Sequence, residues 1–593
     1  MKKINITLIL LSFTFALFAQ KKSLLLLKYE QNYTPTYYEV VEMYQLLDAN
    51  YENAKLIENG LTDSGKPLHT FIINNENEFN PEKIKKQGKS VLLINNSIHP
   101  GEPAGIDASL QFADDILRDK NGIASLLENT VIVIIPAYSI GGLLHRSAFN
   151  RANQTTPYET GFRGNAANLD LNRDFVKCDS ENAKNFTRIF HNWDPDVFLD
   201  THTTNGSDHQ YSVTLIAPQP DLFPPTQEKF LREKMIPELF SNMKKGEYEL
   251  IPYVSWMYRD PKRGIKMTQE GPRYSSGYAS LFNCYGMMTE NHVYKDYPDR
   301  VKSCYQFIDV LTTFTSENAK EIIESRKTGL EESISAKDHP INFELDTTIF
   351  REIEFKGYEV DENQVSKLTG LKRFGYDRSK PFTSSTKYYD VYNPTKTVQI
   401  PEYYILPQAW KSVVDRIKLN GIEFHTLIID TILEVEIDYI DEFSNATRPY
   451  NGHYFHDEVI TSSEVQQINY YSGDLIIPVR QKKIKYLIEM LEPKAGDSFF
   501  RWNFFDNILD NREYFSPYGF EENVIKYLDE HPGLKKKFMD KQKSDPGFAQ
   551  SHRAQLAYIY ENTEWSEETY KRYPVSRVYK AFSVSELNKL IGK

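Results

Sequence analysis

The chain has 593 residues, more than a single hydrophobic core usually serves, so we expect two or more domains. Apolar residues make up 40% of it and charged residues 26%, a balance typical of ordinary globular proteins. Its formal net charge of −12, without long basic runs, argues against polyanion-binding proteins, and we expect no nucleic-acid partner.

The N-terminus has the pattern of a secretory signal. Lys2 and Lys3 precede an apolar stretch, residues 4–18, and the small residue Ala19 follows it. This pattern predicts a cleaved signal peptide at 1–19 and a secreted or periplasmic protein. The stretch is too short to span a membrane, so we expect no integral membrane segment after cleavage. An uncleaved N-terminal anchor is the alternative.

Strand and helix patterns alternate between about residues 30 and 320. Thr36 is placed to cap one helix, and Ile106 begins the apolar stripe of another. The alternation predicts an α/β domain whose mixed, mostly parallel sheet is flanked by helices, and in such sheets ligands gather at strand ends. Short apolar runs predict strands at 70–73, 91–94, 130–135, 197–199, 212–217 and 285–289.

Potential metal ligands follow the predicted strand 91–94. His99 and Glu102 stand beyond its end, and an imidazole nitrogen and a carboxylate oxygen are both ligands that zinc accepts. A catalytic zinc takes three such ligands and a water. His202, just past a later buried strand, is our candidate for the third ligand, because rigid strand ends hold ligand geometry better than loops. His209, in the loop that follows, is the alternative.

A carboxylate ends the predicted strand 285–289. Hydrolysis at a metal needs a base that takes a proton from water and returns it to the leaving nitrogen, and Glu290 is suited to this role. Glu270 is the alternative, although Gly271 and Pro272 place it in a turn.

An adjacent Asn172-Arg173 pair offers the donors that a free carboxylate requires, an amide and a planar guanidinium fork. A second arginine nearby would suit an oxyanion. The pair therefore indicates a substrate that carries a carboxylate.

Taken together and in this order, these residues resemble the zinc metallocarboxypeptidases of the carboxypeptidase A type, over about residues 30–320. The resemblance implies three ligands for one Zn²⁺ per chain, one residue that acts as general base and acid, and two residues that hold the terminal carboxylate of a peptide. The implied zinc ligands are His99, Glu102 and His202. The implied general base and acid is Glu290, and the implied carboxylate-binding residues are Asn172 and Arg173.

The resemblance implies two further roles. The family's oxyanion arginine lies between the first metal pair and the Asn-Arg element, and Arg151 resembles it, with Arg146 and Arg163 as alternatives. The family's substrate-capping tyrosine precedes the base, and Tyr274 resembles it best, with Tyr278 as the alternative. No acidic or basic residue clearly marks the floor of a specificity pocket, so the preferred side chain stays open.

The pattern changes after about residue 338. We expect the catalytic domain at 20–325 and a β-rich α+β accessory domain at 338–490, with a helix over 409–419. Residues 491–593 are expected to form a helical, aromatic C-terminal region. The sequence assigns no role to either region after the catalytic domain.

We therefore expect a secreted zinc metallocarboxypeptidase that removes C-terminal residues from peptides. Its partner is a peptide with a free C-terminal carboxylate. A hydrolase of peptidoglycan stem peptides is an alternative, since the same site can cut wall peptides that end in a carboxylate. A non-catalytic peptide-binding protein of the same fold is another.

Overall fold

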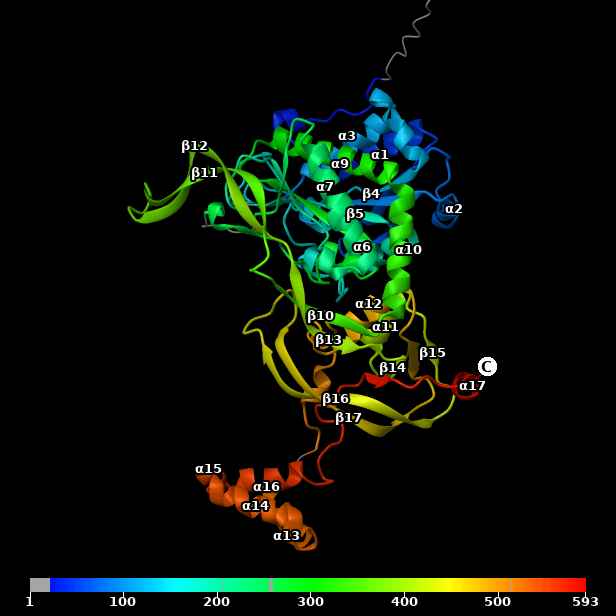
Figure 1. Cartoon of the computed structure of the whole chain (residues 1–593), viewed down its shortest axis with the longest axis vertical. Coiled ribbons are helices and arrows are strands. Elements are labelled where there is room, and N and C mark those ends of the chain that lie inside the picture. Colours follow the sequence, from blue (N-terminus) through cyan, green and yellow to red (C-terminus); the bar gives the residue numbers. More distant parts are fainter. Residues whose placement is uncertain (1–21, 205, 255–259, 514, 593) are drawn as a thin grey trace, which may run out of the picture.

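The computed structural model describes residues 22–204, 206–254, 260–513 and 515–592. The predicted signal peptide at 1–19 lies outside these residues. Figure 1 shows an α/β unit at the top, a β-rich unit below it, and a group of helices at the bottom, from α13 (Pro517–Glu530) to α16 (His552–Glu561). No helix in the described part of the chain is long and apolar enough to span a bilayer.

One mixed sheet of eight strands organises the α/β unit. Its strands are β1 (Ala54–Leu61), β2 (Pro67–Ile73), β3 (Ser90–Asn95), β4 (Thr130–Ile135), β5 (Val197–Thr204), β6 (Val213–Ile216), β7 (Leu250–Pro252) and β9 (Tyr285–His292). They lie in the order β1-β2-β4-β3-β5-β9-β6-β7. The central strands β4, β3, β5 and β9 are parallel, as are β6 and β7, while the other neighbours pair antiparallel. This confirms the predicted mixed, mostly parallel sheet.

Helices cover both faces of this sheet. Successive residues of a strand point to opposite faces. On β5, Phe198 packs against Phe186 of α5 (Glu181–Trp193). Thr201 points the other way and contacts Gly105 of α3 (Ala104–Leu117), where an added Cβ would lie 1.9 Å from the threonine Oγ1. Only glycine therefore fits where α3 crosses β5.

The first helix begins where the sequence places it. Thr36 caps α1 (Tyr37–Asn50), because its hydroxyl accepts from the backbone N–H of Glu39 and the Glu39 carboxylate bonds back to the N–H of Thr36. This reciprocal pair satisfies two N–H groups that a helix end otherwise leaves free.

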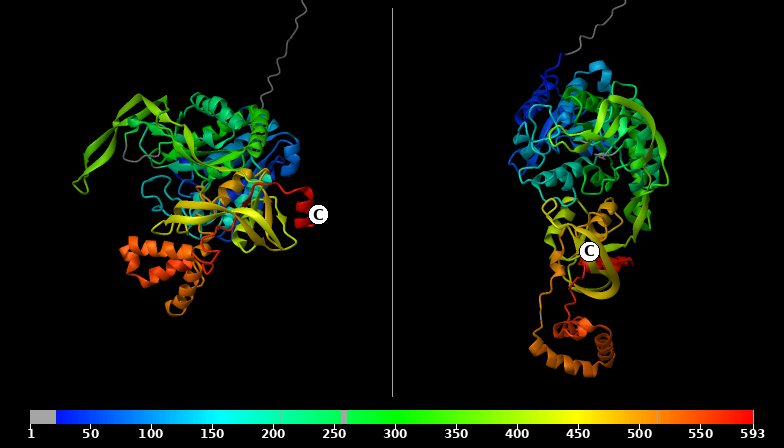
Figure 2. Two further views of the ribbon diagram at one scale, coloured as in Figure 1. Left: turned by 60° about the horizontal axis from the view of Figure 1, so that its bottom comes forward. Right: turned by 90° about the vertical axis from the view of Figure 1, so that its left-hand side faces the viewer.

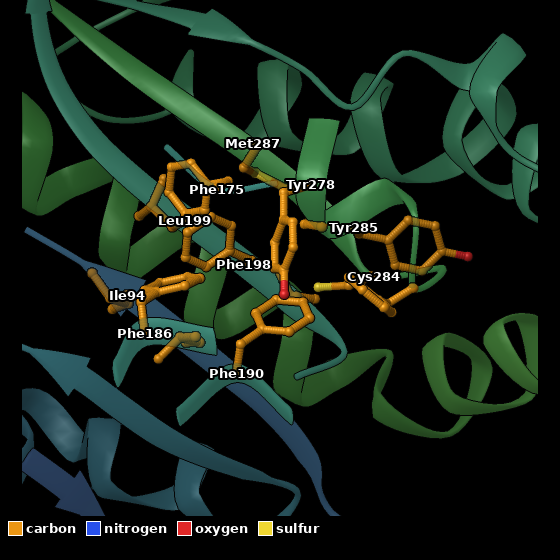
Figure 3. Packing of buried hydrophobic residues seen from close by; sticks show 14 of the residues in the cluster. Ile94, Phe175, Phe186, Phe190, Phe198, Leu199, Tyr278, Cys284, Tyr285 and Met287 are labelled. Atoms are coloured by element: carbon orange, nitrogen blue, oxygen red, sulfur yellow. The ribbon is translucent and has the colours of Figure 1, made fainter. Parts of the chain in front are cut away.

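An aromatic core lies between the sheet and α5 (Figure 3). Tyr278 of α8 (Ser275–Ser280) packs against Phe175, Phe186 and Phe190, with ring centroids 5.6, 6.3 and 5.3 Å away. All four side chains are buried. Their packing holds α8 against the sheet, and with it the chain that enters this helix at Tyr274.

The β-rich unit has its own six-stranded sheet. In spatial order its strands are β15 (His425–Thr426), β18 (Leu475–Pro478), β14 (Tyr403–Leu406), β19 (Ser576–Val578), β16 (Thr431–Asn445) and β17 (His456–Tyr470). The predicted helix over 409–419 corresponds to α11 (Lys411–Leu419). Helix α10 (Ala319–Ser335) crosses the predicted domain end at 325, and β19 lies beyond residue 490 yet pairs within this sheet.

Several contacts hold the β-rich unit against the α/β unit. The long hairpin of β11 (Arg351–Val365) and β12 (Lys372–Tyr389) reaches over the α/β unit (Figure 1) and pairs with β8 (Ile265–Lys266). On the other side, Lys485 of α12 (Ile484–Leu491) donates to the backbone carbonyls of Leu222 and Ser280, at 2.8 and 2.6 Å. The helices α13–α16 stand apart in both views of Figure 2 and have a small core of their own.

Candidate metal centre and substrate cavity

The carboxyl ends of β3 and β5 bring together three side chains of the types that can bind a metal. His99 and Glu102 lie in the loop from β3 to α3, and His202 lies on β5. The Nδ1 atoms of His99 and His202 are 3.4 and 3.2 Å from Oε2 of Glu102. One donor atom from each of the three lies within 4.8 Å of the others. Two imidazoles and a carboxylate are a donor set that suits zinc.

Carboxylates face the far side of both histidine rings. Nε2 of His99 is 2.9 Å from Oδ1 of Asp170, and Nε2 of His202 is 3.0 Å from Oδ2 of Asp200. Such partners fix the ring orientation and keep Nδ1 directed at the cluster. Burial lowers the pKa of His202, but the carboxylates of Asp200 and Glu102 outweigh it and hold that pKa well above its ordinary value.

Glu102 is ionised by its surroundings. Burial raises its pKa, but Arg151 and the two histidines more than offset this and hold the pKa well below its ordinary value. Arg151 donates to Oε1 of Glu102 and, at 3.0 Å, to the carbonyl of Thr203. An ionised carboxylate is the form that coordinates a metal.

Of the other two candidate arginines, Arg163 borders the same site and Arg146 lies away from it. Arg163 is 44% exposed and pairs with Asp170 at 2.9 Å, at the edge of the same site. Arg146 donates to the backbone carbonyls of Thr34 and Pro35, at 3.0 and 3.2 Å. Of the three, Arg151 alone is both largely buried and bonded to a member of the cluster.

The cluster opens into a cavity of about 490 Å³. Glu290 of β9 lies in it, on the strand next to β5 and in register with His202. Burial raises the pKa of Glu290 to about 8, and the nearby carboxylates of Glu102 and Glu270 raise it while His202 lowers it. Among the described residues, none is bonded to its Oε2. The other predicted site residues that line this cavity are His99, Glu102, Arg151, Asn172, Arg173, His202 and Tyr274.

The short 3₁₀ helix η3 (Leu171–Arg173) sets the Asn-Arg pair into the cavity. The Asp170 side chain caps it by accepting from the N–H of Asn172 at 3.0 Å. Nη1 of Arg173 donates to the carbonyl of Asn172 at 2.7 Å, and the ring of Tyr274 lies 4.3 Å from the Arg173 Cζ. Oδ1 of Asn172 accepts from the N–H of Ser275 at 3.0 Å, which ties η3 to the start of α8.

The structure separates the alternatives that the sequence left open. Tyr278 is in the aromatic core, where its hydroxyl donates to Asn420 at 2.9 Å, so it faces away from the cavity. His209 stacks edge-on to His292, with ring centroids 4.5 Å apart, and is not a member of the cluster found among the described residues. Glu270 does line the cavity, and its Oε2 accepts from Ser276 at 2.8 Å.

Three residues of this arrangement were missed from the sequence. Asp200 carried a usable signal, because residues two apart on a strand share a face, and it precedes His202 by two. Asp170 lies within the stretch that contains Asn172 and Arg173, but nothing in the sequence links it to His99. Tyr450, which bonds to Arg173, is 277 positions away and belongs to the β-rich unit.

The fold and the cluster together define the class: an α/β unit with a His-Glu-His site of the kind that holds a catalytic metal. Residues 40–212 match the family model described as zinc carboxypeptidase. This match assigns residues 40–212, within the α/β unit, to the zinc carboxypeptidase family, and together with the curated relatives it supports a hydrolase of the metallocarboxypeptidase class. The matched segment contains His99, Glu102 and His202, and Glu290 lies beyond it.

Individual proteins are distant in sequence. Carboxypeptidase 2 of Trichophyton tonsurans is 18% identical over an alignment of 428 residues, which covers 68% of this chain and 72% of that protein. The metallo-carboxypeptidase of Pseudomonas aeruginosa, solved with (2-guanidinoethylmercapto)succinic acid, is 16% identical over 48% of this chain and 68% of that one, with a TM-score of 0.36. Carboxypeptidase A of Helicoverpa armigera is 13% identical over 50% of this chain and 75% of that one, with a TM-score of 0.34.

Proposed function

We propose that the chain is a secreted zinc-dependent carboxypeptidase that removes C-terminal residues from peptides. The observation that carries the proposal is one cavity that holds a metal-binding cluster, a carboxylate without a partner and a carboxylate-binding arginine. These are His99–Glu102–His202, Glu290 and Arg173.

The zinc would be held by the Nδ1 atoms of His99 and His202 and by a carboxylate oxygen of Glu102. Asp170 and Asp200 would keep the two imidazole rings in orientation. Bound zinc supplies a Lewis acid that polarises the scissile carbonyl and makes a water acidic. The guanidinium of Arg151 stands beside Glu102, where it can also donate to an oxygen that becomes negative.

Glu290 moves the proton. Its Oε2 takes a proton from the attacking water and returns it to the nitrogen of the leaving residue. Its position supports this role, because Glu290 lines the same cavity as the cluster and its Oε2 has no partner among the described residues. Glu270 is less suited, because Ser276 occupies one of its oxygens.

Arg173 and Asn172 recognise the C-terminal end of the substrate peptide. The terminal carboxylate of a peptide would pair with the Arg173 guanidinium and the Asn172 amide, while Tyr274 covers them. A substrate without that carboxylate leaves a largely buried cation without its partner, which costs several kcal/mol of recognition. The site should therefore trim peptide ends and leave internal bonds intact.

The test is mass spectrometry of a peptide pool that contains free-acid and C-terminally amidated versions of each sequence. We expect stepwise loss of C-terminal residues from the free acids alone, abolished by a chelator and restored by Zn²⁺. Equal cleavage of both versions would overturn the carboxylate role of Arg173. Cleavage that survives complete metal removal would overturn the metal-dependent mechanism.

A further inference from the structure

The β-rich unit sends a tight turn into the site. β16 and β17 form a hairpin, and in the segment that joins them Tyr450 and His453 face each other through backbone hydrogen bonds of 2.7 and 3.2 Å. The two residues between them have positive φ angles, 50° at Asn451 and 91° at Gly452. Positive φ at both central positions defines a type I′ turn, for which Asn-Gly is the preferred sequence. We call residues 450–453 the site turn.

Hydrogen bonds of Asn451 and His453 attach the site turn to the α/β unit. Asn451 bonds both backbone groups of Asp170: its Oδ1 accepts from the N–H at 2.8 Å, and its Nδ2 donates to the carbonyl at 3.1 Å. Nε2 of His453 lies 2.8 Å from Oδ2 of Asp179. A side chain that satisfies both backbone groups of one residue sets the position of the turn closely.

Tyr450 contacts Arg173 at the centre of this interface. Its hydroxyl accepts from Nε of Arg173 at 2.8 Å. The guanidinium is thus held on three sides, by Tyr450 at Nε, by the carbonyl of Asn172 at Nη1 and by the ring of Tyr274 on its face. Among the described residues, none is bonded to Nη2, and Arg173 lines the cavity.

Packing contacts also hold the ring of Tyr450 in place. It stacks on the buried indole of Trp502, with ring centroids 6.0 Å apart and planes at 18°. Arg273 lies 5.6 Å from the Tyr450 ring and pairs with Asp497 at 2.7 Å. The hydroxyl of Tyr450 therefore has little freedom to move away from Arg173.

We infer that Tyr450 is a positioning residue for the C-terminal carboxylate of the substrate, so that the β-rich unit completes the binding site of the α/β unit. The inference rests on the proposed function. With Nε bonded to Tyr450 and one N–H of Nη1 bonded to the carbonyl of Asn172, the N–H groups of Nη2 and the second N–H of Nη1 are left for a carboxylate in the cavity that Arg173 lines. Preorganisation of this kind raises affinity because the ligand does not have to order the arginine.

The experiment uses the full-length zinc-loaded protein and the substitution Tyr450→Phe. The phenyl ring keeps the stacking on Trp502 and the ring contact with Arg273, so the turn should stay docked, while the hydroxyl and its contacts with Arg173 and Arg273 are lost. Tyr454→Phe is the matched control, because Tyr454 lies in the same loop and is 54% exposed. Both are also made in a Glu290→Gln background, so that binding can be measured without cleavage.

Calorimetry should measure affinity for one peptide as free acid and as C-terminal amide. We expect Tyr450→Phe to weaken binding of the free acid by about tenfold, the lower end for a hydrogen bond to a charged group, and to leave the amide unchanged. In the active background, KM for the free acid should rise by a similar factor while kcat changes little. Tyr454→Phe should match the parent in all of these.

Three outcomes would overturn the inference. Free-acid affinity and KM equal to the parent in Tyr450→Phe would show that the hydroxyl does not position Arg173. Equal losses for acid and amide, with a lower thermal midpoint, would show a merely structural role. A parent protein that binds acid and amide equally has no carboxylate subsite to position. Absence of peptide cleavage by the wild-type protein would instead count against the proposed function, because calorimetry measures peptide binding independently of cleavage.

Discussion

Asp170 and Glu102 face opposite nitrogens of the His99 ring, at 2.9 Å from Nε2 and 3.4 Å from Nδ1. The same Asp170 carboxylate caps η3 through the N–H of Asn172. One side chain therefore aligns both the histidine proposed as a metal ligand and the pair proposed to bind the substrate carboxylate.

Asp170→Asn should weaken zinc binding by roughly 10- to 100-fold, the usual cost of losing a carboxylate partner behind a metal-binding histidine. The amide keeps the shape and can still cap η3, so the fold should be retained. Competition for zinc with a chromophoric chelator gives the affinity. Asp506→Asn is the control, because Asp506 lies 2.9 Å from His456 in a comparable pair. Unchanged zinc affinity in Asp170→Asn would refute this prediction.

His202→Ala should lose stoichiometric zinc, because it removes one of three protein ligands. His209→Ala should keep it, since His209 contacts His292 instead of the cluster. Zinc content after dialysis against metal-free buffer distinguishes them. A His202→Ala protein that still holds one zinc, beside a His209→Ala protein that does not, would reverse the assignment.

Much of the catalytic unit could be predicted because its signals are local. The apolar run over 130–135 became β4 without change, and Thr36 caps α1 as its position indicated. His99 and Glu102 belong to one loop, and strand ends of a parallel sheet meet at one edge, so His202 could be expected near them. The cluster in the structure has these three members.

What could not be predicted depends on long-range packing. Tyr450 reaches Arg173 across 277 positions, and nothing in a single sequence reports such a pairing. Asn451 and Gly452 do predict a tight turn, but not the surface on which it docks. The pairing of β19 depends on the same kind of long-range packing, since β19 lies beyond residue 490 and joins a sheet whose other strands precede residue 479.

Glu290→Gln should lower kcat/KM by roughly 10²- to 10⁴-fold, the range for loss of a general acid-base group. Zinc content and affinity for a free-acid peptide should be retained, because the cluster and Arg173 are untouched. Glu270→Gln, a change of the same kind in the same cavity, should cost far less. If Glu290→Gln keeps more than about a tenth of the wild-type kcat/KM, or if Glu270→Gln is the more damaging of the two, the proton carrier is not Glu290.

Asp107 should make the fold less stable as pH rises. It is buried on α3, where burial raises its pKa to about 7, although Tyr297 and Thr34 donate to its Oδ2 and lower it. In the unfolded chain an aspartate has a pKa of about 3.9. The folded state therefore holds the proton more tightly, so this contribution to stability is complete below the unfolded pKa and is lost by the time pH passes about 7.

Between pH 5 and pH 8 the Asp107 contribution should fall by on the order of 2 to 3 kcal/mol in the free energy of unfolding. Asp107→Asn should remove this decline, because an amide stays neutral and its oxygen can accept from Tyr297 and Thr34 in the same way. Its nitrogen would replace Oδ1, which has no partner among the described residues. Asp48→Asn, at the surface pair with Lys55, should keep the wild-type dependence on pH. Denaturant unfolding at both pH values measures the difference, and an Asp107→Asn protein whose stability falls as steeply as that of the wild type would show that Asp107 is already ionised at pH 5.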